Sequence, residues 1–170
     1  IPGFAKTRGA TKMLLDGWQL NGILTLSGAT PFTVYDTTNV SLQGSHPEVS
    51  GFFSSRPDLV ADPNAGESTV EQWISPQAFR RLNPLTDAGK FGNAGRNIAR
   101  GPGMGNLDIA LIKDFAFSER TRLQFRAECF NLTNHANFAL PVNDLASPSF
   151  GRILEAGPSR LIQFGLKLFF

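Results

Sequence analysis

Apolar and polar residues alternate in the last eleven residues of the chain, RLIQFGLKLFF, and only Leu161 and Phe169 break the alternation. Successive side chains of an extended strand point to opposite faces, so this period of two predicts a strand over about residues 159–170. A tilted strand crosses a bilayer in roughly 9 to 11 residues, which this segment supplies. The edge strand of a soluble sandwich would show the same pattern. The apolar face of the strand would carry Ile162, Phe164, Leu166, Leu168 and Phe170.

A second alternating segment, TRLQFRAEC, predicts a strand over about residues 121–133. A helix is disfavoured here because its apolar stripe would include Arg126. The two faces of the predicted strand have opposite character. The apolar face carries Leu123, Phe125, Ala127 and Cys129, and the polar face carries Arg122, Gln124, Arg126 and Glu128.

Two further alternating segments lie upstream. GWQLNGILTLSG predicts a strand over about residues 17–35, and NLDIALIKDFAF predicts one over about residues 105–117. In the latter, Lys113 falls among the apolar positions and Ile112 among the polar ones. These exceptions indicate either a β-bulge or a lysine that extends its amine to a membrane boundary.

The connections between the predicted strands differ greatly in length. Only residues 118–120 separate the two middle strands, which predicts a tight hairpin. The links over 36–103 and 134–158 are long and rich in Gly, Pro, Asn and Ser, with one helical turn predicted around SPQAFRRL. If the strands run up and down, both long links fall on one side, as in outer-membrane barrels with short periplasmic turns and long outer loops.

These patterns predict an all-β fold, in which antiparallel up-and-down strands form part of a transmembrane β-barrel with long extracellular loops. A soluble sandwich has no reason to sort its loops in this way. The alternative is a soluble all-β module whose long loops bind a ligand such as a carbohydrate.

Composition narrows the function further. A net charge of +2, with basic residues scattered along the chain, gives no reason to expect a nucleic-acid partner. The single Cys129 allows no internal disulfide, and no Cys or His cluster indicates a metal site. No apolar run approaches the 18 residues of a membrane helix, so strands must carry any membrane role. The chain opens at Ile1 without an initiator methionine, which indicates a segment of a longer protein.

Several segments, in this order, resemble the C-terminal end of TonB-dependent outer-membrane receptors. The most similar group is the Oar-like type, which has an N-terminal carboxypeptidase-regulatory-like domain. The resemblance covers nearly the whole chain. Each segment alone is a weak signal, and the combination of segments in this order is specific. The segments are GWQLNGILTLSGATPFTV, FGNAGRNIARGPGMGNLDIALIKDFAF, RLQFRAECFNLTNHANF, FGRI and IQFGLKLFF.

The resemblance implies a location in the cell outer membrane and a barrel of about 22 strands filled by an N-terminal plug. Such receptors import bulky ligands with energy from an inner-membrane TonB complex, which they contact through an N-terminal region that this chain lacks. Residues 159–170 would then carry the signal read by the barrel-assembly machinery: Ile162, Phe164, Leu166, Leu168 and Phe170. Four strands cannot close a barrel, so outer-membrane lipid, the rest of the barrel and the plug are the expected partners.

Candidate chemistry is sparse, and we predict no catalytic, cofactor-binding or metal-binding residues and no enzyme activity. GPGMGN at 101–106 resembles a phosphate loop, but a strand follows it where a dinucleotide fingerprint needs a helix. His46 and His135 lie in predicted loops without a nucleophile pattern nearby. The polar face of the 121–133 strand, with Arg122, Gln124, Arg126 and Glu128, is predicted to face the lumen. There these residues would contact a plug or solute, or form cross-strand ion pairs in water.

Overall fold

A computed structural model of the chain describes residues 15–38, 40–41 and 55–170. The chain divides into two compact units, and each is described by itself. The sheet unit consists of Ile1–Leu26, Gly105–Ala136 and Pro158–Phe170, and the loop unit consists of Ser27–Met104 and Asn137–Gly157. No helix in the described ranges is both long and apolar enough to span a membrane.

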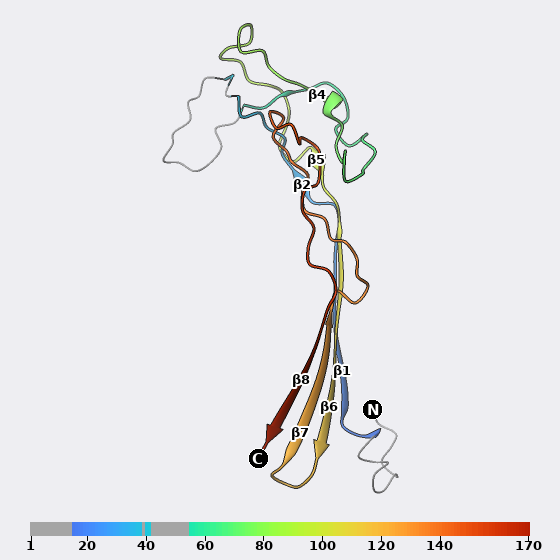
Figure 1. Cartoon of the computed structure of the whole chain (residues 1–170). Helices are drawn as coiled ribbons and strands as arrows, with labels where there is room; N and C mark the ends of the chain where they lie inside the picture. Colours follow the sequence, from blue (N-terminus) through green and yellow to red (C-terminus); the bar gives the residue numbers. More distant parts are fainter. Residues whose placement is uncertain (1–14, 39, 42–54) are drawn as a thin grey trace. The chain divides into compact units, whose positions relative to one another are not determined.

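The sheet unit is built on one four-stranded sheet, with strands in the order β1-β6-β7-β8 (Figure 1). The pairs β6–β7 and β7–β8 are antiparallel and unbroken over eight and nine residue pairs respectively. The all-β antiparallel prediction is therefore confirmed. The strands are β1 (Trp18–Ser27), β6 (Met104–Ala116), β7 (Arg122–Phe130) and β8 (Leu161–Phe169).

Three of the four predicted strands lie within a few residues of their predicted bounds, but the single strand predicted over 17–35 is wrong beyond Ser27. The chain leaves the sheet there, and Pro31–Phe32 forms a separate short strand, β2. Phe32 and Val34 are buried in the core of the loop unit, which explains why this segment does not continue β1. β7 ends at Phe130 because Asn131 adopts a positive φ of 49°, which an extended strand does not allow.

The loop unit contains two small antiparallel sheets instead of an irregular loop. β2 pairs with β5 (Ala99–Arg100), and β3 (Asp58–Leu59) pairs with β4 (Phe79–Arg80). A 3-10 helix over Pro76–Ala78 confirms the helical turn predicted in SPQAFRRL. These elements surround a small apolar core of Phe32, Val34, Ile74, Ala78, Phe79 and Ala99.

One buried carboxylate ties distant parts of the loop unit together. Asp36 is 2% exposed, and its carboxylate accepts hydrogen bonds from Arg81 Nε at 2.9 Å and from the Thr38 hydroxyl at 2.6 Å. Burial alone would raise the pKa of this carboxyl. The hydrogen bonds from Arg81 and Thr38, with the charge of Arg81, outweigh burial and hold the pKa of Asp36 below its usual value.

Asp36→Asn is expected to destabilise the loop unit by about 1 to 3 kcal/mol, because the hydrogen bonds from Arg81 and Thr38 lose their charged acceptor while the half-exposed Arg81 can still be solvated. Since the pKa is lowered on folding, the stabilisation is present above the unfolded pKa of about 3.9 and is lost as pH falls through the folded value. Amide hydrogen exchange in the intact protein should show faster opening in the variant near neutral pH. The difference from wild type should disappear in acid.

The matched control is Glu71→Gln, which breaks an exposed pair between Glu71 and Arg152 with an oxygen to nitrogen distance of 2.5 Å. Glu71 is 74% exposed, so its loss should change exchange little. Equal exchange in Asp36→Asn and Glu71→Gln would contradict a structural role for the buried carboxylate.

Candidate functional site

The register of the sheet separates its residues onto two faces of different chemistry. Opposite residues of neighbouring strands share a face, so the pairs of Phe125 with Lys113 and with Leu166 define one face. The rings of Phe125 and Phe164 stack on this face with centroids 6.1 Å apart. Over the paired stretch that begins at Ile109 in β6 and Cys129 in β7, the residues that β6, β7 and β8 place on this face are all apolar except Lys113. The predicted apolar face of β7 therefore extends across three strands.

The opposite face brings together the four residues predicted to face a lumen: Arg122, Gln124, Arg126 and Glu128. Glu128 accepts hydrogen bonds from Arg126 Nη2 at 2.6 Å and from Gln163 Nε2 at 2.5 Å. Asp114 accepts one from Gln124 Nε2 at 3.1 Å and lies 3.9 Å from Arg122 Nε. These contacts form a ladder of polar pairs across β6, β7 and β8.

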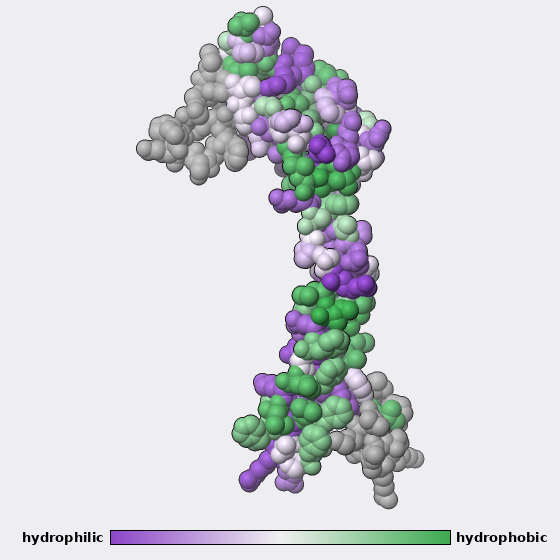
Figure 2. All heavy atoms as spheres, viewed as in Figure 1, coloured by the Kyte–Doolittle hydropathy of each residue, from purple (hydrophilic) through white to green (hydrophobic). Residues whose placement is uncertain are grey.

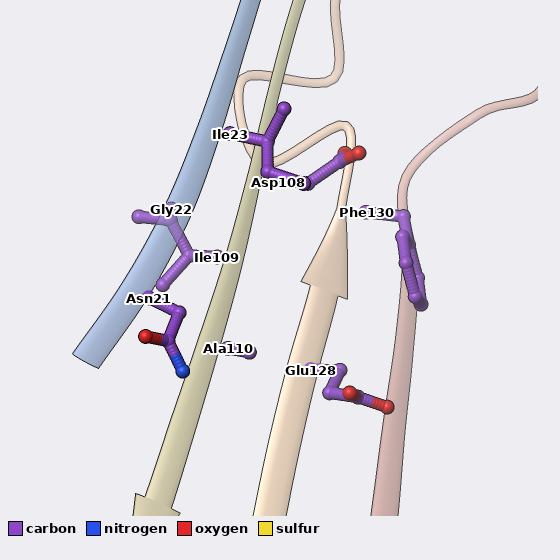
Figure 3. A pocket seen from close by; sticks show the side chains of 8 residues that line it. All are labelled: Asn21, Gly22, Ile23, Asp108, Ile109, Ala110, Glu128 and Phe130. Carbon is purple, nitrogen blue, oxygen red and sulfur yellow. The ribbon is translucent and has the colours of Figure 1, made fainter. Parts of the chain in front are cut away.

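A shallow hollow of about 160 Å³ lies on the sheet between β1, β6 and β7 (Figure 3). Ile23, Ala110 and Phe130 supply much of its apolar lining, and Asn21, Asp108 and Glu128 supply polar groups. Glu128 thus contributes both to this hollow and to the polar ladder. The sequence pattern gave no signal for the hollow, because it depends on the alignment of β1 with β6.

The closing strand presents its predicted apolar residues to the surface. Ile162, Phe164, Leu166 and Leu168 are between 54% and 71% exposed, and Phe170, just beyond β8, is 97% exposed. Figure 2 shows apolar residues at the surface of the sheet unit, among polar ones. Such exposure is typical of a surface that meets lipid or another protein, because a water-exposed sheet rarely carries so many apolar residues.

Phe169 breaks the alternation of β8, because its position in the strand places its ring on the polar face, where two cations lie beside it. Its strand partner is Arg122, whose guanidinium carbon lies 4.4 Å from the ring centroid. Lys167 Nζ lies 4.7 Å from the same centroid. Cation–π attraction therefore explains an aromatic residue among charged ones.

Lys113 is the exception on the apolar face, and it is almost fully buried at 1% exposed. The unbroken β6–β7 register from Ile109 to Ala116 contains no bulge at this position. The lysine amine instead donates a hydrogen bond to the Asp16 carbonyl. A β-bulge in the β6–β7 pair is therefore wrong, whereas a lysine that extends its amine to a membrane boundary stays a prediction.

Asn131 is a structural residue that sequence reasoning missed. It is 5% exposed, and its side-chain amide donates hydrogen bonds to the carbonyls of His135 at 2.9 Å and Pro158 at 3.1 Å. Its backbone N–H donates to the Asp108 carboxylate at 2.8 Å. Asn131 therefore links the end of β7 to the chain just before β8. The NLTNH sequence, with asparagines three residues apart, was the available signal.

The remaining sequence candidates provide no reactive centre in the described residues. β6 begins within the GPGMGN segment, so a strand follows these glycines as predicted. Cys129 is a half-buried free thiol, and the described ranges contain no group of three or more metal-ligating side chains. His46 lies outside the described residues.

Comparison with known proteins connects these features to one family. The model of the outer membrane beta barrel domain family matches residues 2–163. Among curated proteins and among solved structures, the comparisons find no match to this chain.

The family match covers nearly the whole chain and spans both the four-stranded sheet and the long links. It contradicts the alternative of a soluble ligand-binding module and gives the cell outer membrane as the location. Proteins of this family are typically not enzymes. The chain belongs to the outer membrane beta barrel domain family.

Proposed function

We propose that this chain forms the C-terminal part of the barrel of a TonB-dependent receptor, which imports an unidentified ligand across the outer membrane. The observation that carries the proposal is the arrangement of the connections. The Asp114 N–H, near the end of β6, donates to the Gly17 carbonyl, just before β1. The end of β6 therefore lies beside the start of β1, and the end of β1 lies with the start of β6 at the opposite end of the sheet. β7 ends and β8 begins at this same end.

Both long links, over residues 28–103 and 131–160, therefore leave the sheet at one end, and the short turn over 117–121 lies at the other. In outer-membrane barrels the long connections face outward and the short ones face the periplasm. We therefore assign both long links to the extracellular side. The loop unit, with its own apolar core, is then a folded outer surface available to a ligand.

The two faces of the sheet fit lipid on one side and water on the other. The apolar face of β6, β7 and β8 meets outer-membrane lipid in this proposal, and the face with Arg122, Gln124, Arg126 and Glu128 lines the lumen. Paired charges on that face are compatible with water, whereas they would be costly against hydrocarbon. The hollow beside Glu128 then opens to the lumen, where a plug or a passing solute would contact it.

The two edges of the sheet lack neighbours among the described strands. Among the described strands, β1 and β8 each have a single neighbour. Backbone groups within hydrocarbon must be paired, so a barrel wall cannot end at either strand. We propose that the rest of the barrel supplies both neighbours, and that a plug and a TonB-contacting region precede it.

Binding to the periplasmic domain of TonB tests the receptor assignment. The full-length protein from outer-membrane extracts is expected to bind this domain, and deletion of the region preceding the plug is expected to abolish binding. The coding sequence upstream of Ile1 should encode that plug. An upstream region with further strands but no plug, together with no TonB binding, would make the protein a barrel of another class.

A further inference from the structure

The alternation of apolar and polar residues alone does not fix the register in which β1 pairs with β6. The chain from residue 28 to residue 103 separates the two strands, so no tight turn sets their register. A slip by one residue would exchange the two faces, but a slip by two residues would keep each face matched. By contrast, a short turn fixes the β6–β7 register.

The surroundings of Lys113 distinguish the native register from a slipped one. The Lys113 amine donates to the Asp16 carbonyl and lies 3.3 Å from the Asp114 carbonyl oxygen. It also lies 5.6 Å from the centroid of the Trp18 ring and 4.7 Å from that of the Phe115 ring. Trp18 is the first residue of β1 and Asp16 lies two residues before it, whereas Asp114 and Phe115 belong to β6 itself. Of these contacts, those with Asp16 and Trp18 depend on how β1 is aligned.

Gly17 allows β1 to approach β6 closely at this point. Its φ is +73°, and a Cβ atom at this position would lie 2.8 Å from the Asp114 carbonyl oxygen. The Gly17 carbonyl accepts the Asp114 N–H at 3.0 Å. A residue with a side chain would therefore have an unfavourable φ here, and its Cβ would clash with the Asp114 carbonyl. The glycine lets the chain turn so that the Asp16 carbonyl reaches the lysine.

We propose that Lys113, together with Gly17 and Trp18, fixes the register in which β1 pairs with β6. A slip by two residues shifts β1 by about 7 Å along β6 and takes both the Asp16 carbonyl and the Trp18 ring away from the amine. A buried ammonium that loses such partners is strongly disfavoured. Lys113 is thus a positioning residue for assembly of the sheet. The proposal is independent of TonB and of any transported ligand.

Two engineered cysteine pairs report the register. Counting along antiparallel β1 and β6 from the bond between the Asp114 N–H and the Gly17 carbonyl places Leu20 directly opposite Leu111. Leu20→Cys with Leu111→Cys therefore reports the native register, because such pairs allow disulfide geometry. Gly22→Cys with Leu111→Cys reports a slip by two residues.

Both pairs are made in the full-length protein with Cys129→Ala, assembled in its outer membrane and oxidised. With Lys113 present, the native pair should cross-link and the slipped pair should not. Lys113→Met keeps a long side chain but removes the charge, and should lower the ratio of native to slipped cross-link about tenfold, as expected for loss of a charge-assisted hydrogen bond. Lys113→Arg should retain the native ratio. The matched control, Ile112→Met on the opposite face, should also leave the ratio unchanged.

An unchanged ratio in Lys113→Met, at any yield of assembled protein, would overturn the proposal, because a general loss of stability does not select a register. If Lys113→Met does not reach the membrane, Trp18→Leu is measured in the same way. It removes one ring from the amine and leaves the Asp16 carbonyl in place. We expect about a threefold fall in the ratio from the loss of one cation–π contact, and no fall would equally overturn the proposal.

Discussion

Phe125→Arg is expected to destabilise the membrane-inserted protein by about 2 to 4 kcal/mol, whereas Gln124→Arg is expected to have a mild effect. Phe125 stacks on Phe164 and lies on the apolar face, so an arginine there would face hydrocarbon. Gln124 lies on the opposite face, where it donates a hydrogen bond to Asp114. An arginine at this position would meet the same carboxylate. The two positions are adjacent, so they differ in face but hardly in depth.

Refolding of the full-length protein into lipid vesicles at increasing urea measures this difference. Gln124→Arg also introduces the same positive charge, so it controls for the effect of charge on refolding yield. Equal tolerance of arginine at the two positions would show that neither face of β7 meets lipid.

Deletion of Phe170, or addition of a few serines after it, is expected to slow barrel assembly and leave the protein in the periplasm. If the assembly machinery adds β8 to an open sheet edge, alternate side chains would fill its pockets and the terminal aromatic would anchor the end. Phe169 cannot take over this role, because its position in β8 places its ring on the polar face, beside Arg122 and Lys167. Deletion of Phe170 would therefore leave an aromatic terminus that faces the wrong side.

Pulse-chase fractionation of outer membrane and periplasm measures the rate of assembly. The serine extension separates two roles for Phe170, because it keeps the aromatic ring near the membrane boundary but moves the terminus away. Arrival of the extended protein at the normal rate would contradict the signal and leave Phe170 as part of an aromatic girdle.

The sheet could largely be predicted from sequence because alternation is a local signal. Apolar and polar residues alternate within 122–129 and within 162–168, and this pattern does not depend on the neighbouring strand. The two strands and their faces could therefore be assigned before their register was known. The Lys113 exception was also visible, but the group that its amine contacts was not. The Asp16 carbonyl that satisfies the lysine is 97 residues away along the chain, and no periodicity points to it.

The loop unit could not be predicted for a related reason. Its core joins Phe32 and Val34 to Ile74, Phe79 and Ala99, which come from short segments without a regular period. Two of these residues continued the alternation of β1 and were therefore assigned to that strand. Phe32 instead belongs to β2, which pairs with β5, and Val34 is buried in the same core. Phe169 was difficult for the same reason, since its cationic neighbour Arg122 belongs to another strand.

The exposure of β7 to lipid and water tests the central claim most directly, which is that the sheet is a section of barrel wall. Each position from 122 to 129 of the full-length protein is changed in turn to a single cysteine, which carries a spin label in outer-membrane vesicles. The natural Cys129 is removed whenever another position is labelled. Collision with oxygen, which concentrates in lipid, should be highest at 123, 125, 127 and 129. Collision with a water-soluble nickel chelate should be highest at 122, 124, 126 and 128. Access of the chelate to both sets alike, or a pattern with the opposite phase, would contradict the account.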